Sequence, residues 1–286
     1  MGDRRGTRGD LLKTLTGKDL AAAIRAQTQA EAAAGPQPRL AVVVATADEA
    51  SLWYVRSIAK AAAGVGIACD VIDLGPEATP ERIGETLARL SADPDVHGLM
   101  LQTPLPAGAS AQELAAAIDP RKDVDGANPL SLGRLAAGLP AFPPATAAAV
   151  LALLDHHEVE TAGRRAVVVG RSTVVGKPLA HLLLDRHATV TVCHSRTRDL
   201  AAVTSQAEVL VAAAGRAGLI GAGHVARGAV VIDVGTNPTD DGGLTGDVDF
   251  EAVSAVAGAL TPVPGGVGPV TTALLLRHTA RAANLP

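Results

Sequence analysis

Short runs of apolar, mostly β-branched residues alternate along this chain with longer segments of helix-forming residues. In the first half, the runs that predict buried strands cover residues 39–44, 69–74 and 97–102, and the segments that predict helices cover residues 11–34, 50–65, 79–91 and 111–118. Strands joined by helices pair in parallel, because each crossover returns the chain to the same edge of the sheet. The pattern therefore predicts an α/β fold.

The alternation resumes after residues 140–144, where prolines predict a hinge. The predicted strands of the second half cover residues 166–169, 189–192, 209–212 and 230–234, and the predicted helices cover residues 146–156, 179–184 and 270–283. Residues 262–269 are so rich in glycine and proline that we expect a loop without regular structure. A chain of 286 residues exceeds what one core usually serves, so we expect two domains and a cleft, the second domain beginning near residue 144.

Charge and cysteine content narrow the function classes. The net charge is −4 and there is no long basic run, so the chain lacks the charge pattern expected of a nucleic-acid-binding protein. A protein that acts on small molecules is therefore favoured. No apolar stretch reaches membrane-spanning length, and the first dozen residues read as a flexible extension. Cys69 and Cys193 lie far apart and have no metal-ligand spacing, so we expect no metal, no disulfide and a reducing, cytoplasmic location.

A glycine turn connects the predicted strand at 166–169 to the helix that follows it. Gly170 permits a tight turn and Gly176 permits close packing of the helix, so the N–H groups at the helix start can face a pyrophosphate. The middle glycine of the usual dinucleotide fingerprint is absent, which leaves an ordinary strand-to-helix turn as an equal reading of this segment alone.

The residues after the next strand decide between NAD and NADP, because a carboxylate there would bind a ribose hydroxyl and repel a 2′-phosphate. Residues 193–198 contain no carboxylate, and Ser195 and Arg196, together with Arg171, have the donors that a phosphate needs. The pattern favours NADP over the alternative that Arg196 and Arg198 are solvated surface charges.

Several further blocks occur in an order typical of one family. With residues 168–172, 175–178 and 193–195, the blocks at residues 102–106, 122–126, 133–135 and 261–269 resemble the bifunctional methylenetetrahydrofolate dehydrogenase/methenyltetrahydrofolate cyclohydrolases. The resemblance runs from about residue 40 to the C-terminus. It implies a folate-binding catalytic α/β domain over residues 1–143, completed by the C-terminal helix at about 270–286. It further implies a Rossmann-type NADP-binding domain with a parallel sheet over residues 144–269, and a homodimer formed through the Rossmann domains.

The resemblance also implies the site residues. Those for NADP are Gly170, Arg171, Ser172, Gly176, His194, Ser195, Arg196 and Thr236. Those for the tetrahydrofolate substrate are Ser51, Tyr54, Val55, Asp125, Gly266 and Pro269, and the catalytic group comprises Tyr54, Gln102 and Asp125.

Two of these residues have chemistry suited to a folate. Tyr54, the only tyrosine, would stack on the aromatic part of the substrate, although an aromatic residue on an alanine-rich helix also suits core packing. Asp125 can accept hydrogen bonds from the amino-pyrimidinone edge of a pterin, with a turn or cap role as the alternative.

The chain departs from the family at one catalytic position. The family reads Tyr-Val-x-x-Lys, whereas here Tyr54 and Val55 are followed by Ile58 at the position of the lysine. Lys60 lies about 200° away around a helix, so it or Arg56 can replace the lysine only if the helix is irregular.

The two reactions of the family place different demands on that lysine. Hydride removal from the methylene carbon leaves a resonance-stabilised cation and moves no proton, so it mainly requires positioning. Hydrolysis of the methenyl cation needs water delivery and proton transfers, which the family assigns to the lysine and the counterpart of Gln102. We therefore expect NADP-dependent oxidation of 5,10-methylenetetrahydrofolate, in one-carbon metabolism and purine biosynthesis, with weak or absent cyclohydrolase activity because of Ile58.

Three alternatives stay open from the sequence. The protein could retain both activities despite Ile58, oxidise another folate or other substrate with NADP on the same scaffold, or bind folate and NADP without catalysis.

Overall fold

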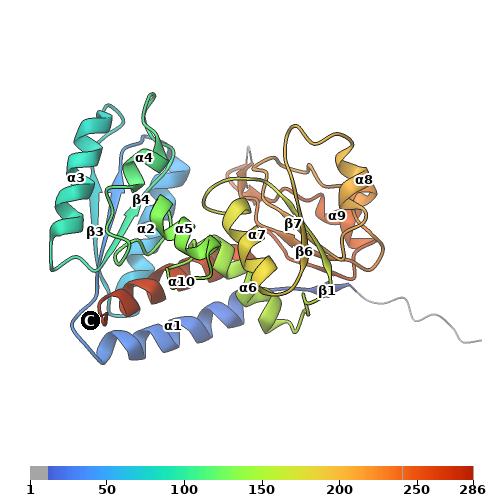
Figure 1. Ribbon diagram of the computed structural model, residues 1–286, viewed down its shortest axis with the longest axis horizontal. Coiled ribbons are helices and arrows are strands. Elements are labelled where there is room, and N and C mark those ends of the chain that lie inside the picture. Colours follow the sequence, from blue (N-terminus) through green and yellow to red (C-terminus); the bar gives the residue numbers. More distant parts are fainter. Residues whose placement is uncertain (1–11, 240, 286) are drawn as a thin grey trace, which may run out of the picture.

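The computed structural model describes residues 12–239 and 241–285 and contains two α/β units side by side (Figure 1). The first unit has a parallel sheet with the strand order β3-β2-β4, formed by β2 (Arg39–Val44), β3 (Ala68–Asp73) and β4 (Gly98–Leu101). Its helices are α2 (Glu49–Ala63), α3 (Pro80–Ala92), α4 (Ala111–Ala115) and α5 (Pro129–Ala136). The two faces of the sheet pack on separate apolar clusters, because successive residues of β2 point to opposite sides.

The second unit has a parallel sheet with the order β1-β11-β8-β7-β5-β6. Its strands are β1 (Lys13–Thr14), β5 (Arg165–Val169), β6 (Thr189–Cys193), β7 (Val209–Ala212), β8 (Val230–Asp233) and β11 (Ala259–Leu260). The remaining elements of this half are α6 (Ala145–His156), α7 (Gly176–Asp185), α8 (Leu200–Thr204), η1 (Ala222–His224), α9 (Phe250–Ser254) and the antiparallel pair β9 (Asn237–Pro238) and β10 (Leu244–Thr245). The α/β fold and the parallel sheet that the sequence predicts are confirmed.

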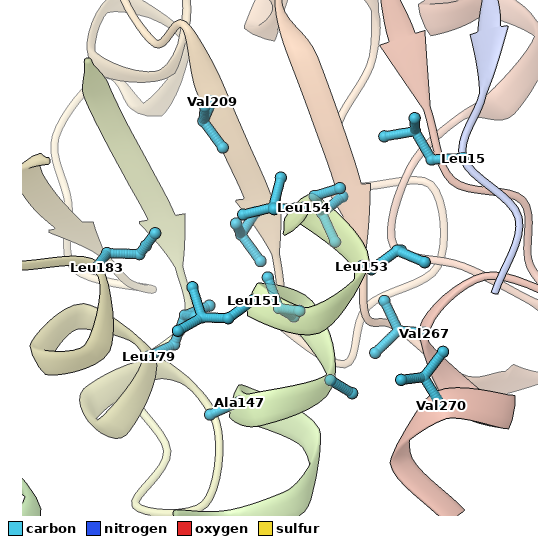
Figure 2. Close-up of a cluster of buried hydrophobic side chains, with 14 of the residues drawn as sticks. Leu15, Ala147, Leu151, Leu153, Leu154, Leu179, Leu183, Val209, Val267 and Val270 are labelled. Carbon is cyan, nitrogen blue, oxygen red and sulfur yellow. The ribbon is translucent and has the colours of Figure 1, made fainter. Parts of the chain in front are cut away.

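Two long helices connect the units: α1 (Lys18–Ala33) and α10 (Val267–Ala282). The first turns of α10 contribute Val267 and Val270 to the core of the second unit, and its later turns contribute Leu275 and Leu276 to the core of the first. Figure 2 shows Leu151, Leu153 and Leu154 of α6 among residues from the large sheet, α7 and α10. Because α6 is apolar around most of its circumference, it is buried on nearly every side.

Two sequence predictions about local structure are wrong, and one helix was not predicted. The first helix begins at Lys18 rather than residue 11, because Lys13 and Thr14 pair with Ala259 and Leu260 as an edge strand of the large sheet. Leu11 and the residues before it, part of the predicted flexible extension, lie outside the described residues. The loop predicted over 262–269 ends early, since α10 begins at Val267.

Pro269 is compatible with a start of α10 at Val267, because the N–H groups in the first turn of a helix have no intrahelical partner and a proline there loses no hydrogen bond. The helix α5 was not predicted, although its start has clear signals: Pro129 stands at the first position and the Asn128 side chain accepts a hydrogen bond from the Leu130 N–H at 2.7 Å. None of the helices in the described ranges is long and apolar enough to cross a membrane.

Candidate active site

The large sheet has a topological switch point between β5 and β7. The chain passes from β5 to β6 on one side, and then returns to place β7 and β8 on the other side of β5. In open parallel sheets, ligands bind at the carboxyl ends of the strands beside such a reversal. The loops that follow β5, β6, β7 and β8 therefore border the region where a dinucleotide would bind, which is called the crevice below.

The loop after β5 is packed too tightly for side chains at its glycines. Gly170 has a φ of 135°, and a Cβ there would lie 2.1 Å from the carbonyl oxygen of Ala213 in the loop after β7. A Cβ on Gly176 would lie 2.1 Å from the carbonyl oxygen of Gly170. The Ser172 hydroxyl accepts hydrogen bonds from the N–H groups of Val175 at 3.1 Å and Gly176 at 3.4 Å. The predicted cofactor residues of this turn thus lie together, with Arg171 exposed beside them.

The loop after β6 presents donors and no carboxylate. His194 organises it: its N–H donates to Thr197 Oγ1 at 2.8 Å, and its ring Nδ1 accepts from the N–H of Arg196 at 3.1 Å. Ser195 and Arg196 are exposed. Thr236, also predicted to bind the cofactor, lies on the other side of the switch point, where it is exposed after β8. The predicted cofactor residues thus lie on both sides of β5 at the carboxyl edge of the sheet.

The substrate residues predicted in the first unit gather between α2, α10 and the loop that contains Asp125. Burial raises the pKa of Tyr54 to about 12, with a further contribution from the negative charge of Asp125, while a hydrogen bond with Thr272 of α10 opposes the rise. Burial raises the pKa of Asp125 to about 7, and the neighbouring charge of Asp123 adds to the rise. These mutual effects indicate that Tyr54, Asp125 and Thr272 lie close together, and the region around them is called the pocket below. Thr272 was not predicted, because its contact with Tyr54 depends on how α10 packs.

The turn that carries Asp125 is held rigidly. Asp123 is fully buried and accepts hydrogen bonds from the N–H groups of Ala127 and Asn128, both at 2.9 Å. His278 of α10 donates its Nδ1 proton to the carbonyl oxygen of Val124 at 2.9 Å. Burial lowers the pKa of His278 to about 4, so this ring is neutral near pH 7 and acts as a structural donor.

Ser51 and Gln102 converge on the carbonyl oxygen of Thr103. The Ser51 hydroxyl donates to this oxygen at 3.1 Å and the Gln102 Nε2 group donates to it at 2.5 Å. The other amide atom, Gln102 Oε1, is buried and accepts no hydrogen bond from any described residue. A buried acceptor without a donor costs about 1–3 kcal/mol, so this atom marks a position where a ligand or water can bind favourably.

Ile58 is fully buried on the same face of the sheet as Gln102. It belongs to an apolar cluster with Val42 and Val44 of β2 and Met100 of β4, and Gln102 continues the side of β4 on which Met100 lies. Arg56 and Lys60 are both exposed on a helix without interruption. The condition under which one of them could replace the family lysine, an irregular helix, is therefore not met.

The glycines before α10 serve packing as well as access. A Cβ on Gly266 would lie 2.7 Å from the carbonyl oxygen of Pro262, and the N–H of Gly17 donates to the carbonyl oxygen of Gly265 at 2.9 Å. Nothing lies within 4 Å of the position of a Cβ on Gly268, next to the half-buried Pro269. There is thus space for a pterin or nicotinamide ring beside Gly268. Gly266, in contrast, must be a glycine because a side chain there would clash with neighbouring residues of the protein.

Two buried aspartates near the crevice were not predicted either. Asp233 ends β8, and Asp247 follows β10. Burial raises the pKa of Asp233 to about 6, although backbone N–H groups of Asp247, Val248 and Gly235 oppose the rise. An aspartate at the end of an apolar run was the available signal for Asp233.

Together, these features define a two-unit α/β protein: the second unit has a switch point of the type that binds dinucleotides, and the first unit has a group of buried and half-buried polar side chains. Residues 144–285 match the family model for the NAD(P)-binding domain of tetrahydrofolate dehydrogenase/cyclohydrolase, and residues 15–125 match the model for its catalytic domain. The chain belongs to the tetrahydrofolate dehydrogenase/cyclohydrolase family. This assignment confirms the predicted resemblance and the predicted class of enzyme.

Named relatives agree with this assignment. The bifunctional protein FolD 1 of Saccharopolyspora erythraea is 68% identical over 276 residues, which cover 95% of this chain and 94% of the relative. The crystal structure of the bifunctional enzyme FolD from Campylobacter jejuni is 39% identical and has a TM-score of 0.91, covering 96% of this chain and 99% of the other. The Trypanosoma brucei methylenetetrahydrofolate dehydrogenase-cyclohydrolase, solved with NADP and an inhibitor, is 35% identical and has a TM-score of 0.90, covering 96% and 97% of the two chains.

Proposed function

We propose that this protein oxidises 5,10-methylenetetrahydrofolate to 5,10-methenyltetrahydrofolate with NADP, in one-carbon metabolism that supplies purine biosynthesis. We further propose that its cyclohydrolase activity, which would convert the product to 10-formyltetrahydrofolate, is weak or absent. The observation that carries the second part is the environment of position 58, where an isoleucine is enclosed by apolar side chains.

The crevice residues fit NADP by their chemistry. Gly170 and Gly176 bring the backbone of the first turn close to the ligand, and the N–H groups at the start of α7 suit a pyrophosphate. Ser195 and Arg196 would hold the 2′-phosphate, since both are exposed in a loop without a carboxylate. When bound, NADP accepts the hydride from the methylene carbon. No protein side chain needs to exchange a proton during that transfer.

The pocket in the first unit would hold the pterin and the aromatic ring of the substrate. Asp125, when ionised, accepts hydrogen bonds from the pterin amide and amino groups, and Tyr54 offers its ring for stacking. Ser51 and Val55 lie on the same helix, and Gly266 and Pro269 precede or begin α10 beside it. Together they orient the methylene carbon towards the crevice, which is the main requirement of hydride transfer.

Hydrolysis of the methenyl group requires more from the protein. A group must orient the water and transfer protons while the ring opens. Isoleucine has no polar atom, and Arg56 and Lys60 lie on the exposed side of α2. Gln102 can still orient a water through Oε1, but a carboxamide does not exchange protons near neutral pH.

Two spectrophotometric assays on one preparation test the proposal. The first follows formation of NADPH from methylenetetrahydrofolate, and the second follows decay of added methenyltetrahydrofolate against buffer alone. We expect turnover in the first assay and a decay close to the buffer rate in the second. Decay well above the buffer rate would establish a bifunctional enzyme, and binding of both ligands without NADPH formation would establish a non-catalytic binding protein. Turnover of a different substrate only would establish another oxidoreductase.

We also propose a homodimer formed through the large sheets and a cytoplasmic location. The outer strand β6 has no neighbour on one side among the described residues, and its Val192 is 38% exposed. Leu184 on the adjacent helix α7 is 52% exposed, so both the strand and the helix present an exposed apolar side chain that a partner could cover. Both cysteines are free, which agrees with a reducing compartment.

A further inference from the structure

The fully buried carboxylate of Asp247 organises the loop that follows β7. Its Oδ2 accepts hydrogen bonds from the N–H groups of Ala214 at 2.6 Å and Gly215 at 2.9 Å, and its Oδ1 accepts from the N–H of Arg216 at 2.8 Å. Three consecutive backbone N–H groups thus converge on one carboxylate, an arrangement that normally binds an anion. In this chain the anion is the protein's own side chain.

The same carboxylate also holds the loop that follows β8. Asp247 Oδ1 accepts a hydrogen bond from the Asn237 side-chain amide at 2.9 Å, and a Cβ on Gly235 would lie 2.3 Å from this oxygen. Asp233 completes the arrangement, because its Oδ1 accepts from the N–H groups of Gly235 and Asp247, both at 2.9 Å. Thr236 therefore lies between Gly235 and Asn237, whose positions both depend on Asp247.

Both loops border the crevice at the switch point. The carbonyl oxygen of Ala213, directly before the three N–H groups, would lie 2.1 Å from a Cβ on Gly170. A displacement of the loop after β7 would therefore change the contact with the glycine turn. In a dinucleotide-binding sheet the first strand pair holds the adenosine half, so β7 and β8, across the switch point, border the nicotinamide half.

We propose that Asp247 is a positioning residue for the nicotinamide half of the cofactor: it fixes the loops after β7 and β8 so that this part of the crevice is formed before NADP binds. The inference rests on the proposed function, since it takes NADP as the ligand. Asp247 itself is buried beneath the loops and acts through their backbone. A preformed crevice avoids ordering two loops at the moment of binding, which increases affinity.

The variant Asp247→Asn tests this role with almost no change of shape. In the parent, both carboxylate oxygens of Asp247 accept hydrogen bonds from backbone N–H groups. The amide of an asparagine has only one oxygen, so in either orientation its NH₂ group would face N–H donors and could not accept their hydrogen bonds. The control is Asp249→Asn, since Asp249 is an exposed aspartate nearby that caps α9 through the N–H of Ala252. Binding of two compounds is measured by titration calorimetry: NADP, and adenosine 2′,5′-bisphosphate, which contains only the adenosine half and its 2′-phosphate.

We expect Asp247→Asn to weaken NADP binding about tenfold or more, equivalent to about 1.4 kcal/mol, and to change the affinity for adenosine 2′,5′-bisphosphate less than about twofold. We expect Asp249→Asn to leave both affinities unchanged. Unchanged NADP binding by Asp247→Asn, or an equal loss for both compounds, would overturn the proposal.

If Asp247→Asn does not fold, Asn237→Ala decides, because it removes a single donor to the carboxylate. It should weaken NADP binding about threefold and leave the bisphosphate unaffected, and unchanged NADP binding would overturn the inference. A parent chain that binds the bisphosphate but not NADP would also overturn it. A parent chain that binds neither compound would overturn the proposed cofactor, which is a different failure.

Discussion

Replacing Ile58 with lysine would test directly whether this position separates the two activities. Ile58 is fully buried among apolar side chains, so the introduced ammonium group would lose its hydration. Burial lowers the pKa of a lysine by up to about 3–5 units, and a shift of about three units costs about 4 kcal/mol at neutral pH. A hydrogen bond from the ammonium to Gln102 Oε1, for which the described part of the chain supplies no donor, would contribute about 1.5–3 kcal/mol. We therefore expect Ile58→Lys to lower the free energy of unfolding by about 1–3 kcal/mol.

The sign of the pH dependence provides a check on this reasoning. A lysine whose pKa is lowered by folding destabilises the protein at pH values below that lowered pKa. The destabilisation decreases as the pH rises towards the ordinary lysine value of about 10.4. Chemical denaturation of the parent and Ile58→Lys at pH 7 and pH 9.5 should thus give a smaller difference at the higher pH. A difference that does not change would contradict burial of the ammonium.

The expected gain is in hydrolysis alone. A positioned acid–base group contributes about 10²–10⁴-fold to a rate, and an imperfectly placed lysine should still raise methenyltetrahydrofolate decay at least about tenfold above the parent. NADPH formation should change only a few-fold, because hydride transfer requires no proton from this position.

Two further variants test the cause of that gain. Ile58→Met keeps an apolar side chain of similar size and should cost less than about 1.5 kcal/mol without any gain in hydrolysis. Adding Gln102→Ala to Ile58→Lys should remove most of the gain, since the ammonium loses its expected partner. The reasoning is refuted if the parent already hydrolyses methenyltetrahydrofolate rapidly and folded Ile58→Lys is no faster.

Three other predictions concern the pocket, the crevice and the dimer. Asp125 has a pKa of about 7 and should bind the pterin when ionised, so the KM for methylenetetrahydrofolate at saturating NADP should rise about tenfold per pH unit below 7. Asp125→Asn should raise this KM and flatten the pH profile, and a flat parent profile would contradict the assigned role. Arg196→Ala should lower the ratio of kcat/KM for NADP to that for NAD about tenfold, whereas Arg198→Ala should change it less than twofold; equal effects would contradict the phosphate site. Val192→Lys should convert a dimer to a monomer in light scattering at micromolar concentration, and an unchanged mass would exclude β6 as the interface.

The sequence predicted the elements that are defined by their own composition. The strand at residues 39–44 and the strand at 209–212 agree with β2 and β7 at both ends, because a continuous apolar run is required for burial on two faces. The short strand Lys13–Thr14 could not be predicted in this way, since its structure depends on pairing with β11 near the other end of the chain. The local composition of Lys13–Thr14 favours a helix, but pairing with the edge of the large sheet determines the observed structure.

The same distinction applies to the site. The glycine turn and the loop after β6 are contiguous segments, so their motifs placed Gly170 and Ser195 at the carboxyl edge before the fold was known. Thr272 and Asp247 contribute through contacts between distant segments, which no spacing reveals. Their assignment required the packing of α10 and the course of the chain after β10.

Position 58 links stability to chemistry through two opposing free-energy terms. A lysine at this position would satisfy Gln102 Oε1 but would be buried as a charge, whereas Ile58 avoids that desolvation and leaves the amide oxygen without a donor from the described residues. Desolvation of the charge, about 4 kcal/mol, outweighs the hydrogen bond to the amide oxygen, about 1.5–3 kcal/mol. The isoleucine therefore favours the fold by the difference, about 1–3 kcal/mol, while it removes the acid–base group. It follows that the amide oxygen of Gln102 should gain its hydrogen bond from bound substrate or water, so Gln102→Ala in the parent should weaken folate binding rather than destabilise the fold.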